Sequence, residues 1–279
     1  MAEPCTTSYR LVWEPLLTGR RVSRRGASFR RVRLIAGVVV AGLIVTGCST
    51  ADSKDIRTSG IKADFRVTVK DNETRVDVLA TLRAGTLTYV ELGNDEAINV
   101  AGTNSMTEQD PTFIRTKLRR NKSLGVTNYS GRLEDELLAV THVSFDLHRD
   151  SDNESAQSNV NLPERLQLIA PAVGTRASRQ SPITVRISGP SYLPTTVNWT
   201  GSCIQEGELR LPPRSVVGHI PAGRIKQSPV SPSAGQTATT SCTVTIKVFR
   251  RENGTLSPAF KDGSVVAEAQ SSRDITSIP

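Results

Sequence analysis

Side chains that carry most enzyme chemistry are scarce in this 279-residue chain, which has only three histidines and four cysteines. The sequence contains no G-x-S-x-G nucleophile motif, no H-E-x-x-H zinc motif and no glycine-rich phosphate-binding loop. These absences argue against nucleophilic catalysis, zinc-dependent hydrolysis and nucleotide chemistry. We therefore predict that the protein is a structural or binding module rather than an enzyme and that it uses no cofactor. The alternative is a hydrolase or metal-dependent enzyme whose site assembles from dispersed residues.

A hydrophobic run long enough to cross a membrane is also missing. The apolar stretch at residues 34–46 has thirteen residues, whereas a membrane-spanning helix needs about 20. Seven arginines precede it between positions 20 and 33, and such a positive flank before a short apolar segment is typical of a secretory signal peptide. We expect the chain that follows to be exported. Because whole signal peptides usually have about 15 to 30 residues, we also expect translation to start downstream of Met1.

The apolar stretch ends in Val45-Thr46-Gly47-Cys48. This order of an aliphatic residue, two small residues and a cysteine resembles the lipobox of bacterial lipoproteins. The resemblance implies that Cys48 carries a diacylglycerol and is the first residue of the mature chain, held on the membrane by about 0.8 kcal/mol per buried methylene. Ser49, in place of an aspartate, favours the outer membrane where a cell has two. An ordinary cleaved signal and a short membrane anchor are the alternatives.

The positive charge of the chain lies mostly in this leader. Eight of the 35 basic residues and two of the 27 acidic residues precede Cys48, which leaves 27 basic and 25 acidic residues, a net charge of +2, in the mature part. Nucleic-acid binders need a basic excess to neutralise phosphates. We therefore predict no nucleic-acid partner and expect the membrane and an envelope protein or polysaccharide instead.

No long helical period occurs in the mature part, in which Thr, Val, Ser and Gly are abundant and Pro and Gly recur at short intervals. This composition is typical of an all-β protein. The 232 residues from Cys48 onward suffice for two domains of about 100 to 120 residues each. We predict a signal segment at 1–47, a flexible polar tether at 48–60, and β-sandwich domains at 61–163 and 164–279.

Alternation of apolar and polar residues predicts the strands of the first domain. Residues 61–69 and 76–82 alternate on either side of a polar turn, as in a β-hairpin. In the strand predicted at 140–147, Val143, Phe145 and Leu147 share one face. Between 103 and 124 the pattern weakens, and Ile114 and Leu118 are the clear core candidates. Shorter strands are predicted at 86–92, 97–100, 127–131 and 160–162.

The second domain carries a resemblance of its own. Pro171, Gly174 and the segment PITVRI at 182–187 resemble the opening strands of immunoglobulin-like and fibronectin-like modules, so we predict immunoglobulin-like sandwiches. The segments GSCI, HIPAG and SCTVTIKVFRRENGTLSPAF resemble uncharacterised bacterial envelope lipoproteins with two such domains. That resemblance implies fold and location, and no activity. Further strands are predicted at 166–173, 197–199, 203–205, 208–211, 215–220, 240–249 and 265–270.

Cys203 and Cys242 remain once Cys5 is assigned to the leader and Cys48 to the anchor. An even pair in an oxidising compartment favours a disulfide. The bond would close a loop of about 40 residues and stabilise the fold by about 4 kcal/mol in the chain-entropy model. A zinc site needs more ligands than these two cysteines offer, and we predict no metal.

Histidines and carboxylates form two further clusters. His142, Asp146 and His148 share a strand face, but about 20 Å would separate the two histidines, so they cannot bind one ion. A solvated polar face is the interpretation we favour. The acidic residues at 134–136 point in different directions, and we expect them in a solvated loop.

Two charged segments complete the candidates. Asp150, Asp152 and Glu154 alternate as calcium ligands do, but the glycine and glutamate of the calcium-binding loop are absent. Whether this loop binds calcium stays open. A basic strip alternates with other residues in the weak region, and it predicts either contact with anionic lipid or wall polymers or a strand edge protected from pairing. The strip consists of Arg115, Lys117 and Arg119.

Overall fold

The computed structural model describes residues 49–71, 73–104, 113–123, 125–135, 140–149, 155–228 and 241–279. Contacts group residues 49–279 into one compact unit. Strands and two 3-10 turns, without an α-helix, make up the described part, which confirms the predicted all-β class. None of its helical segments is long and apolar enough to span a membrane. The elements are β1 (Ser49–Asp52), η1 (Ser53–Asp55), η2 (Thr58–Gly60), β2 (Lys62–Lys70), β3 (Arg75–Arg83), β4 (Thr88–Glu91), β5 (Ala97–Thr103), β6 (Phe113–Lys117), β7 (Arg119–Ser123), β8 (Val126–Glu134), β9 (His142–His148), β10 (Ala156–Asn161), β11 (Leu168–Ala170), β12 (Arg176–Ser178), β13 (Ile183–Ile187), β14 (Thr195–Gly201), β15 (Gly207–Leu211), β16 (Val217–Ile220), β17 (Cys242–Asn253) and β18 (Asp262–Ile278).

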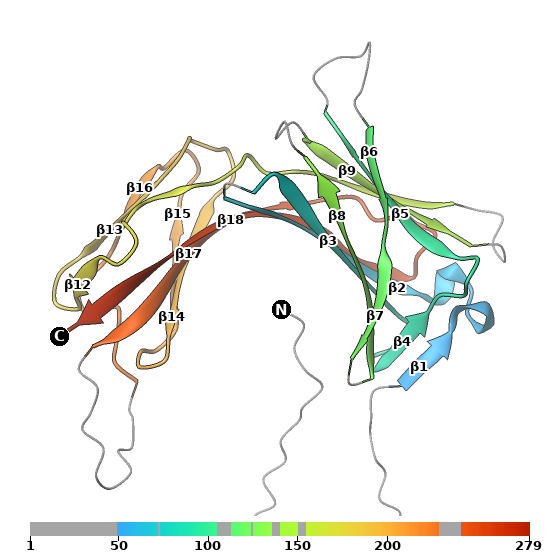
Figure 1. Ribbon diagram of the computed structural model, residues 1–279, viewed down its shortest axis with the longest axis horizontal. Helices are drawn as coiled ribbons and strands as arrows, with labels where there is room; N and C mark the ends of the chain where they lie inside the picture. Colours follow the sequence, from blue (N-terminus) through green and yellow to red (C-terminus); the bar gives the residue numbers. More distant parts are fainter. Residues whose placement is uncertain are drawn as a thin grey trace, which may run out of the picture. The chain divides into compact units, whose positions relative to one another are not determined.

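The first sandwich packs part of a large sheet, with β2, β3 and β8, against a four-stranded sheet in the order β10-β9-β5-β6 (Figure 1). β2 and β3 pair antiparallel as the predicted hairpin. Their inward residues alternate with outward polar ones, because successive strand side chains point to opposite faces. Phe65 of β2 stacks on Phe145 of β9 with ring centroids 4.5 Å apart. This contact joins the two sheets across the core.

The second sandwich has the strand arrangement of an immunoglobulin domain. One sheet contains β11, β13 and β16, and the facing part of the large sheet runs β18-β17-β14-β15. In the nomenclature of immunoglobulin domains, the first sheet corresponds to strands A, B and E, and the second corresponds, in the order given, to strands G, F, C and C′. Trp199 lies on β14, which corresponds to strand C, and it is 1% exposed and packs in the core. Immunoglobulin domains have their buried tryptophan at this position. The predicted immunoglobulin-like fold is therefore confirmed here.

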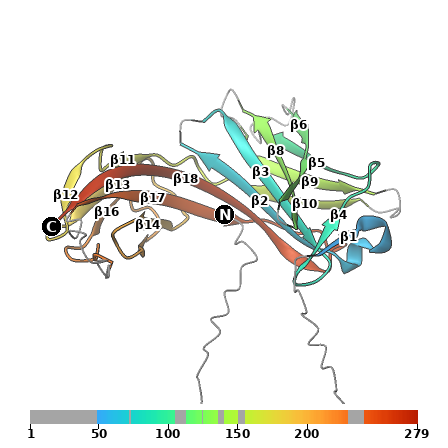
Figure 2. The same ribbon diagram turned by 60° about the horizontal axis from the view of Figure 1, so that its bottom comes forward.

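The two longest strands, β17 and β18, run side by side (Figure 2), and β18 contributes residues to the cores of both sandwiches. The first nine residues of β18 pair in parallel with β2, and its residues from Val266 to Ser277 pair antiparallel with β17. Consequently Val265 and Ala267 belong to the first core, whereas Ala269 and Ile275 belong to the second. A cut at the predicted boundary of residues 163 and 164 would remove these C-terminal residues from the first core.

Residues 49–60 differ from the tether that their polar composition predicted. β1 pairs in parallel with β4, and η1 and η2 place Ser53 and Thr58 in buried positions. The buried Arg149 donates hydrogen bonds to the carbonyl oxygens of Ser53 (2.6 Å) and Ile56 (2.8 Å). Hydrogen bonds from a distant arginine hold the segment on the sandwich, together with the partly buried Ile56, which packs against the first core. Composition alone does not reveal such a partner.

Residues 113–123 form two strands that the weak pattern did not predict. β6 pairs with β5, and β7 pairs with β8. Leu118, between them, is buried and Ile114 packs against the first core, as predicted. Every residue of β7 is exposed. An edge strand without a buried face has no reason to alternate apolar and polar residues, which explains the missing signal.

Candidate functional site

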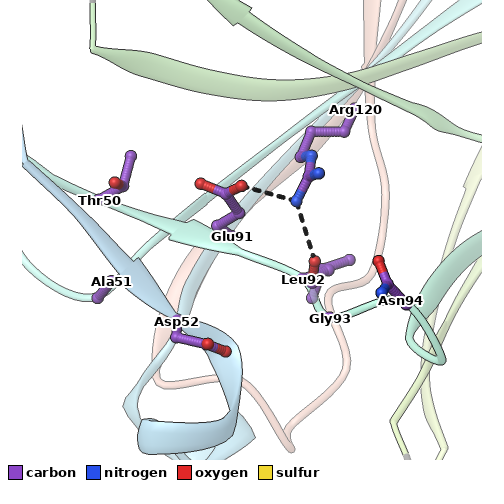
Figure 3. Close-up of a pocket in the computed structure, with 8 residues that line it drawn as sticks. All are labelled: Thr50, Ala51, Asp52, Glu91, Leu92, Gly93, Asn94 and Arg120. Atoms are coloured by element: carbon purple, nitrogen blue, oxygen red, sulfur yellow. Dashed lines mark hydrogen bonds and ion pairs between the residues drawn. The ribbon is translucent and has the colours of Figure 1, made fainter.

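A polar pocket of about 410 Å³ lies beside β1 in the first sandwich (Figure 3). One wall is β1, a second is the end of β4 with the turn after it, and Arg120 reaches in from β7. The parallel pairing of β1 with β4 brings the first two walls together. The lining residues are Thr50, Ala51, Asp52, Glu91, Leu92, Gly93, Asn94 and Arg120.

The charges of the pocket neutralise one another. Glu91 pairs with Arg120 at 2.7 Å and with Lys122 at 3.0 Å, and Arg120 also donates to the carbonyl oxygen of Leu92 at 3.4 Å. Figure 3 shows the Arg120 side chain extending between these two acceptors. The backbone amide and ammonium of Lys54 hold the pKa of Asp52 below its usual value. A small polar ligand would therefore meet paired charges and hydrogen-bonding groups.

A buried polar network lies beneath the pocket. Arg149 binds Glu96 at 2.9 Å, and Glu96 accepts from the Gly93 amide at 2.8 Å and from the Ser53 hydroxyl. Burial alone would raise the pKa of Glu96, but the hydrogen bonds from Ser53 and Arg149 lower it below its usual value. Glu96 is therefore an anion that positions the 49–60 segment against the turn after β4.

Tyr129 holds the other side of that turn. Its hydroxyl donates to the carbonyl oxygen of Val90 at 3.1 Å and accepts from the amide of Leu92 at 2.8 Å. Burial raises the pKa of Tyr129, so the phenol stays protonated and can make both bonds. The turn that lines the pocket is consequently fixed at Val90, Leu92 and Gly93.

Arg149 is not among the candidate residues predicted from the sequence, although the alternation along β9 indicates that its side chain points inward. Val143, Phe145 and Leu147 alternate inward on β9 and are all buried as predicted, and continuing the alternation places Arg149 inward. A charged residue at an inward position needs a buried partner. The partner, Glu96, precedes β5 and has no comparable sequence signal.

Asp135 differs from the solvated loop predicted for the acidic residues at 134–136. It is 1% exposed, accepts hydrogen bonds from the Val140 amide at 3.3 Å, and pairs with Arg165 at 2.8 Å. Arg165 also donates to the carbonyl oxygen of Glu73 at 2.9 Å. Glu134 is exposed as expected, and Glu136 lies outside the described residues. A long-range arginine makes Asp135 a structural group.

The predicted disulfide is present. Cys203, just after β14, bonds to Cys242 at the start of β17, with Cα atoms 6.0 Å apart. In immunoglobulin domains the bridge instead joins the B and F strands, so this chain has the tryptophan position without that disulfide position. Cys48, the predicted lipidation site, lies outside the described residues.

The histidine cluster does not gather into a site. His142 bonds to Asn161 at 3.0 Å through Nδ1, and Asp146 accepts from the hydroxyl of Ser155. Among the residues that the structure describes, no three His, Cys, Asp or Glu side chains are placed to hold a metal. The pocket beside β1 contains no histidine. The predicted calcium-type residues, Asp150, Asp152 and Glu154, lie outside the described residues.

The basic strip lies on two strands. Arg115 and Lys117 are exposed on β6, and Arg119 is exposed at the start of β7. On β6 they alternate with the partly buried Ile114 and Thr116, as the sequence pattern predicted. An anionic partner for this strip stays a prediction.

Comparisons with known proteins give no family. No family model and no curated protein matches the chain. Among solved structures, similar chains include Dpr11 IG1 bound to DIP-gamma IG+IG2, with 8% identity over 77% of this chain and 98% of that chain and a TM-score of 0.23. A tandem pair of titin Ig domains has 11% identity over 78% of this chain and 96% of that chain, also with a TM-score of 0.23. TM-scores of 0.23 are too low to assign a fold, and the immunoglobulin-like assignment of the second sandwich depends on its strand order and on Trp199.

Proposed function

We propose that this protein is a lipid-anchored binding module of the bacterial cell envelope, held on the membrane by acyl chains on Cys48 and without catalytic activity. The leader supports export, and Val45-Thr46-Gly47-Cys48 supports lipidation. The partner class is an envelope protein or polysaccharide. The outer membrane is the favoured location where a cell has two.

The observation that carries the proposal is the position of β1. Ser49 donates its amide to the carbonyl oxygen of Leu87 at 3.2 Å and bonds through its hydroxyl to Thr88 at 3.0 Å. Consecutive Cα atoms lie about 3.8 Å apart, so a lipid on Cys48 would sit next to a folded strand. The anchor would hold the first sandwich directly at the headgroups.

The edge beside Ser49 suits such a position. Leu87 is 47% exposed there, on the connection between β3 and β4. Thr50 and Asp52 line the polar pocket, and at about 3.3 Å per strand residue Asp52 lies about 10 Å from Ser49. The pocket would therefore open close to the membrane surface.

Binding explains the pocket better than catalysis does. Both of its carboxylates are paired with cations: Glu91 with two basic side chains of β7, and Asp52 with Lys54. None of the described histidines lines the cavity. A nucleophile needs an adjacent base in hydrogen-bond reach. Thr50 is the one hydroxyl in the lining, and no base lines the pocket beside it other than these paired carboxylates.

The test is metabolic labelling with palmitate. Cys48→Ala should abolish labelling and release the protein into the soluble fraction, because the acceptor thiol is lost. Cys5→Ala is the matched control, since it removes the other leader cysteine and should leave labelling intact. Labelling that survives Cys48→Ala would contradict the anchor.

A further inference from the structure

Two loops at one end of the second sandwich present an exposed aromatic side chain. Residues 188–194 connect β13 to β14, and residues 212–216 connect β15 to β16. Tyr192 in the first loop is 76% exposed, more than any other large apolar side chain in the described ranges. The Arg214 guanidinium from the second loop lies over its ring, 4.8 Å from the centroid.

The backbone at Arg214 is strained. Arg214 has a φ of 65°, and the Ser215 amide closes a turn onto the carbonyl oxygen of Pro212 at 3.2 Å. Glycine is favoured at this third turn position, because a side chain there costs about 1 to 2 kcal/mol. The Arg214 amide also binds the carbonyl oxygen of Ser191 at 2.6 Å, which joins the two loops. A strained residue that carries a large charged side chain points to function.

A buried arginine braces the Tyr192 loop from below. Arg250 of β17 is 1% exposed. It donates to the Thr195 hydroxyl at 3.1 Å and to the carbonyl oxygen of Gly189 at 2.8 Å. These bonds fix both ends of the loop. Loops fixed before binding lose less conformational entropy on association, so this arrangement favours recognition.

Further exposed apolar side chains occur at the same end. Val217 begins β16 and Ile169 lies at the irregular pairing of β11 with β13, and each is 43% exposed. Arg186 of β13 pairs with Val217 across the sheet. Neither Arg186 nor Arg214 forms an ion pair with a carboxylate of the described chain. We name this set, Ile169, Arg186, Tyr192, Arg214 and Val217, the Tyr192 surface.

We infer that the Tyr192 surface docks a protein whose contact patch is partly apolar and carries carboxylates. This rests on the proposed binding function and names the surface that performs it. Tyrosine and arginine are enriched in interface hot spots, and the two arginines, which have no carboxylate partner among the described residues, attract acidic groups. A protein fits better than a neutral polysaccharide, because Ile169 and Val217 offer aliphatic contacts and the arginines require charge.

The experiment begins with photo-crosslinking in intact envelopes. Tyr192 is replaced by p-benzoylphenylalanine in the full chain, and Val173 is replaced in the same way as the control. Val173 is 72% exposed between β11 and β12. The protein captured at position 192 is then purified, and its affinity for the full chain is measured at two salt concentrations.

We expect Tyr192→Ala to weaken that affinity by about 30-fold and Arg214→Gly by about 10-fold, as hot-spot truncations do. Val173→Ala should bind as the unaltered chain does, and added salt should weaken binding. Because Arg214→Gly relieves the strain at φ 65°, its melting temperature should not fall. Lost affinity in a variant of undiminished stability separates recognition from unfolding.

Three results would overturn the inference: no capture at position 192 above position 173, unchanged affinity of Tyr192→Ala, or adducts that contain only polysaccharide. Failure of the anchor is recognised independently by palmitate labelling of Cys48→Ala. A chain that keeps its label after Cys48→Ala but binds through the Tyr192 surface would refute the anchor alone.

Discussion

Replacing Arg149 with leucine removes the centre of the buried network beneath the pocket. Arg149 donates to Glu96 at 2.9 Å, to the Thr58 hydroxyl at 2.9 Å, and to two backbone carbonyls of residues 53–56. The substitution leaves the Glu96 anion in a site where its side chain is 9% exposed. Removing one partner of a buried ion pair costs about 3 to 5 kcal/mol, because the other charge stays buried without compensation.

Local unfolding of residues 49–60 limits the loss of stability that Arg149→Leu can cause. We expect residues 49–60 to detach from the sandwich without unfolding either core, since the buried core residues begin at Ile61 and only the partly buried Ile56 of this segment packs against them. We therefore expect the global free energy of unfolding to fall by at most about 3 to 5 kcal/mol, and hydrogen exchange of residues 49–60 to accelerate first. Denaturant unfolding and hydrogen exchange measure the two effects separately.

A surface arginine provides the control. Arg132 pairs with Asp77 at 3.2 Å while 61% exposed, and exposed ion pairs contribute about 0 to 1 kcal/mol. Arg132→Leu should therefore change stability by less than about 1 kcal/mol. The reasoning is refuted if Arg149→Leu matches this control in both unfolding and exchange.

Three further perturbations test the second sandwich and its junction with the first. Cys203→Ser with Cys242→Ser should lower the free energy of unfolding by about 4 kcal/mol, measured against the oxidised chain in denaturant. Burial would raise the pKa of Glu268, but two basic side chains of β17 hold it below its usual value. The ionised Glu268 therefore stabilises the folded state fully above the unfolded pKa of about 4.5, and this stabilisation is lost as pH falls through the folded pKa. Glu268→Gln should consequently make the free energy of unfolding less dependent on pH in the acid range. Gly207→Ala should cost about 1 to 3 kcal/mol, because a methyl group there meets the buried ring of Trp199, and a melting temperature equal to that of the unaltered chain would refute the contact.

Alternation allowed the half-buried strands to be predicted. β2, β3 and β9 each have one buried and one polar face, so their inward residues follow a period of two that the sequence displays. The hairpin of β2 and β3 was predictable for the same reason. The disulfide followed from having two cysteines and an oxidising compartment.

Long-range partners account for what sequence could not predict. Residues 49–60 are folded by Arg149, about 90 positions later in the chain, and Asp135 is buried by Arg165. β18 reads as an ordinary strand from residue 265, yet it extends through Ile278 and completes both cores. A residue pattern shows which face of a strand is apolar, but it does not show which partner covers a polar segment.

The Tyr192 surface has weak sequence signals of the same kind. Both loops contain two prolines, at 190 and 194 in the first and at 212 and 213 in the second, and proline restricts the backbone in a turn. Arg214 is the third residue of the turn that begins at Pro212, a position that glycine would occupy without strain. The sequence does not show that Arg214 occupies a position suited to glycine, because only its φ angle reveals this.

The central claim is that lipid on Cys48 attaches a folded strand to the membrane. Mass spectrometry of the N-terminal tryptic peptide from the membrane fraction tests it most directly. The account predicts a peptide that begins at Cys48, ends at Lys54 and carries the mass of a diacylglycerol with its acyl chains. A peptide that begins at another residue, or one with an unmodified Cys48, would contradict it.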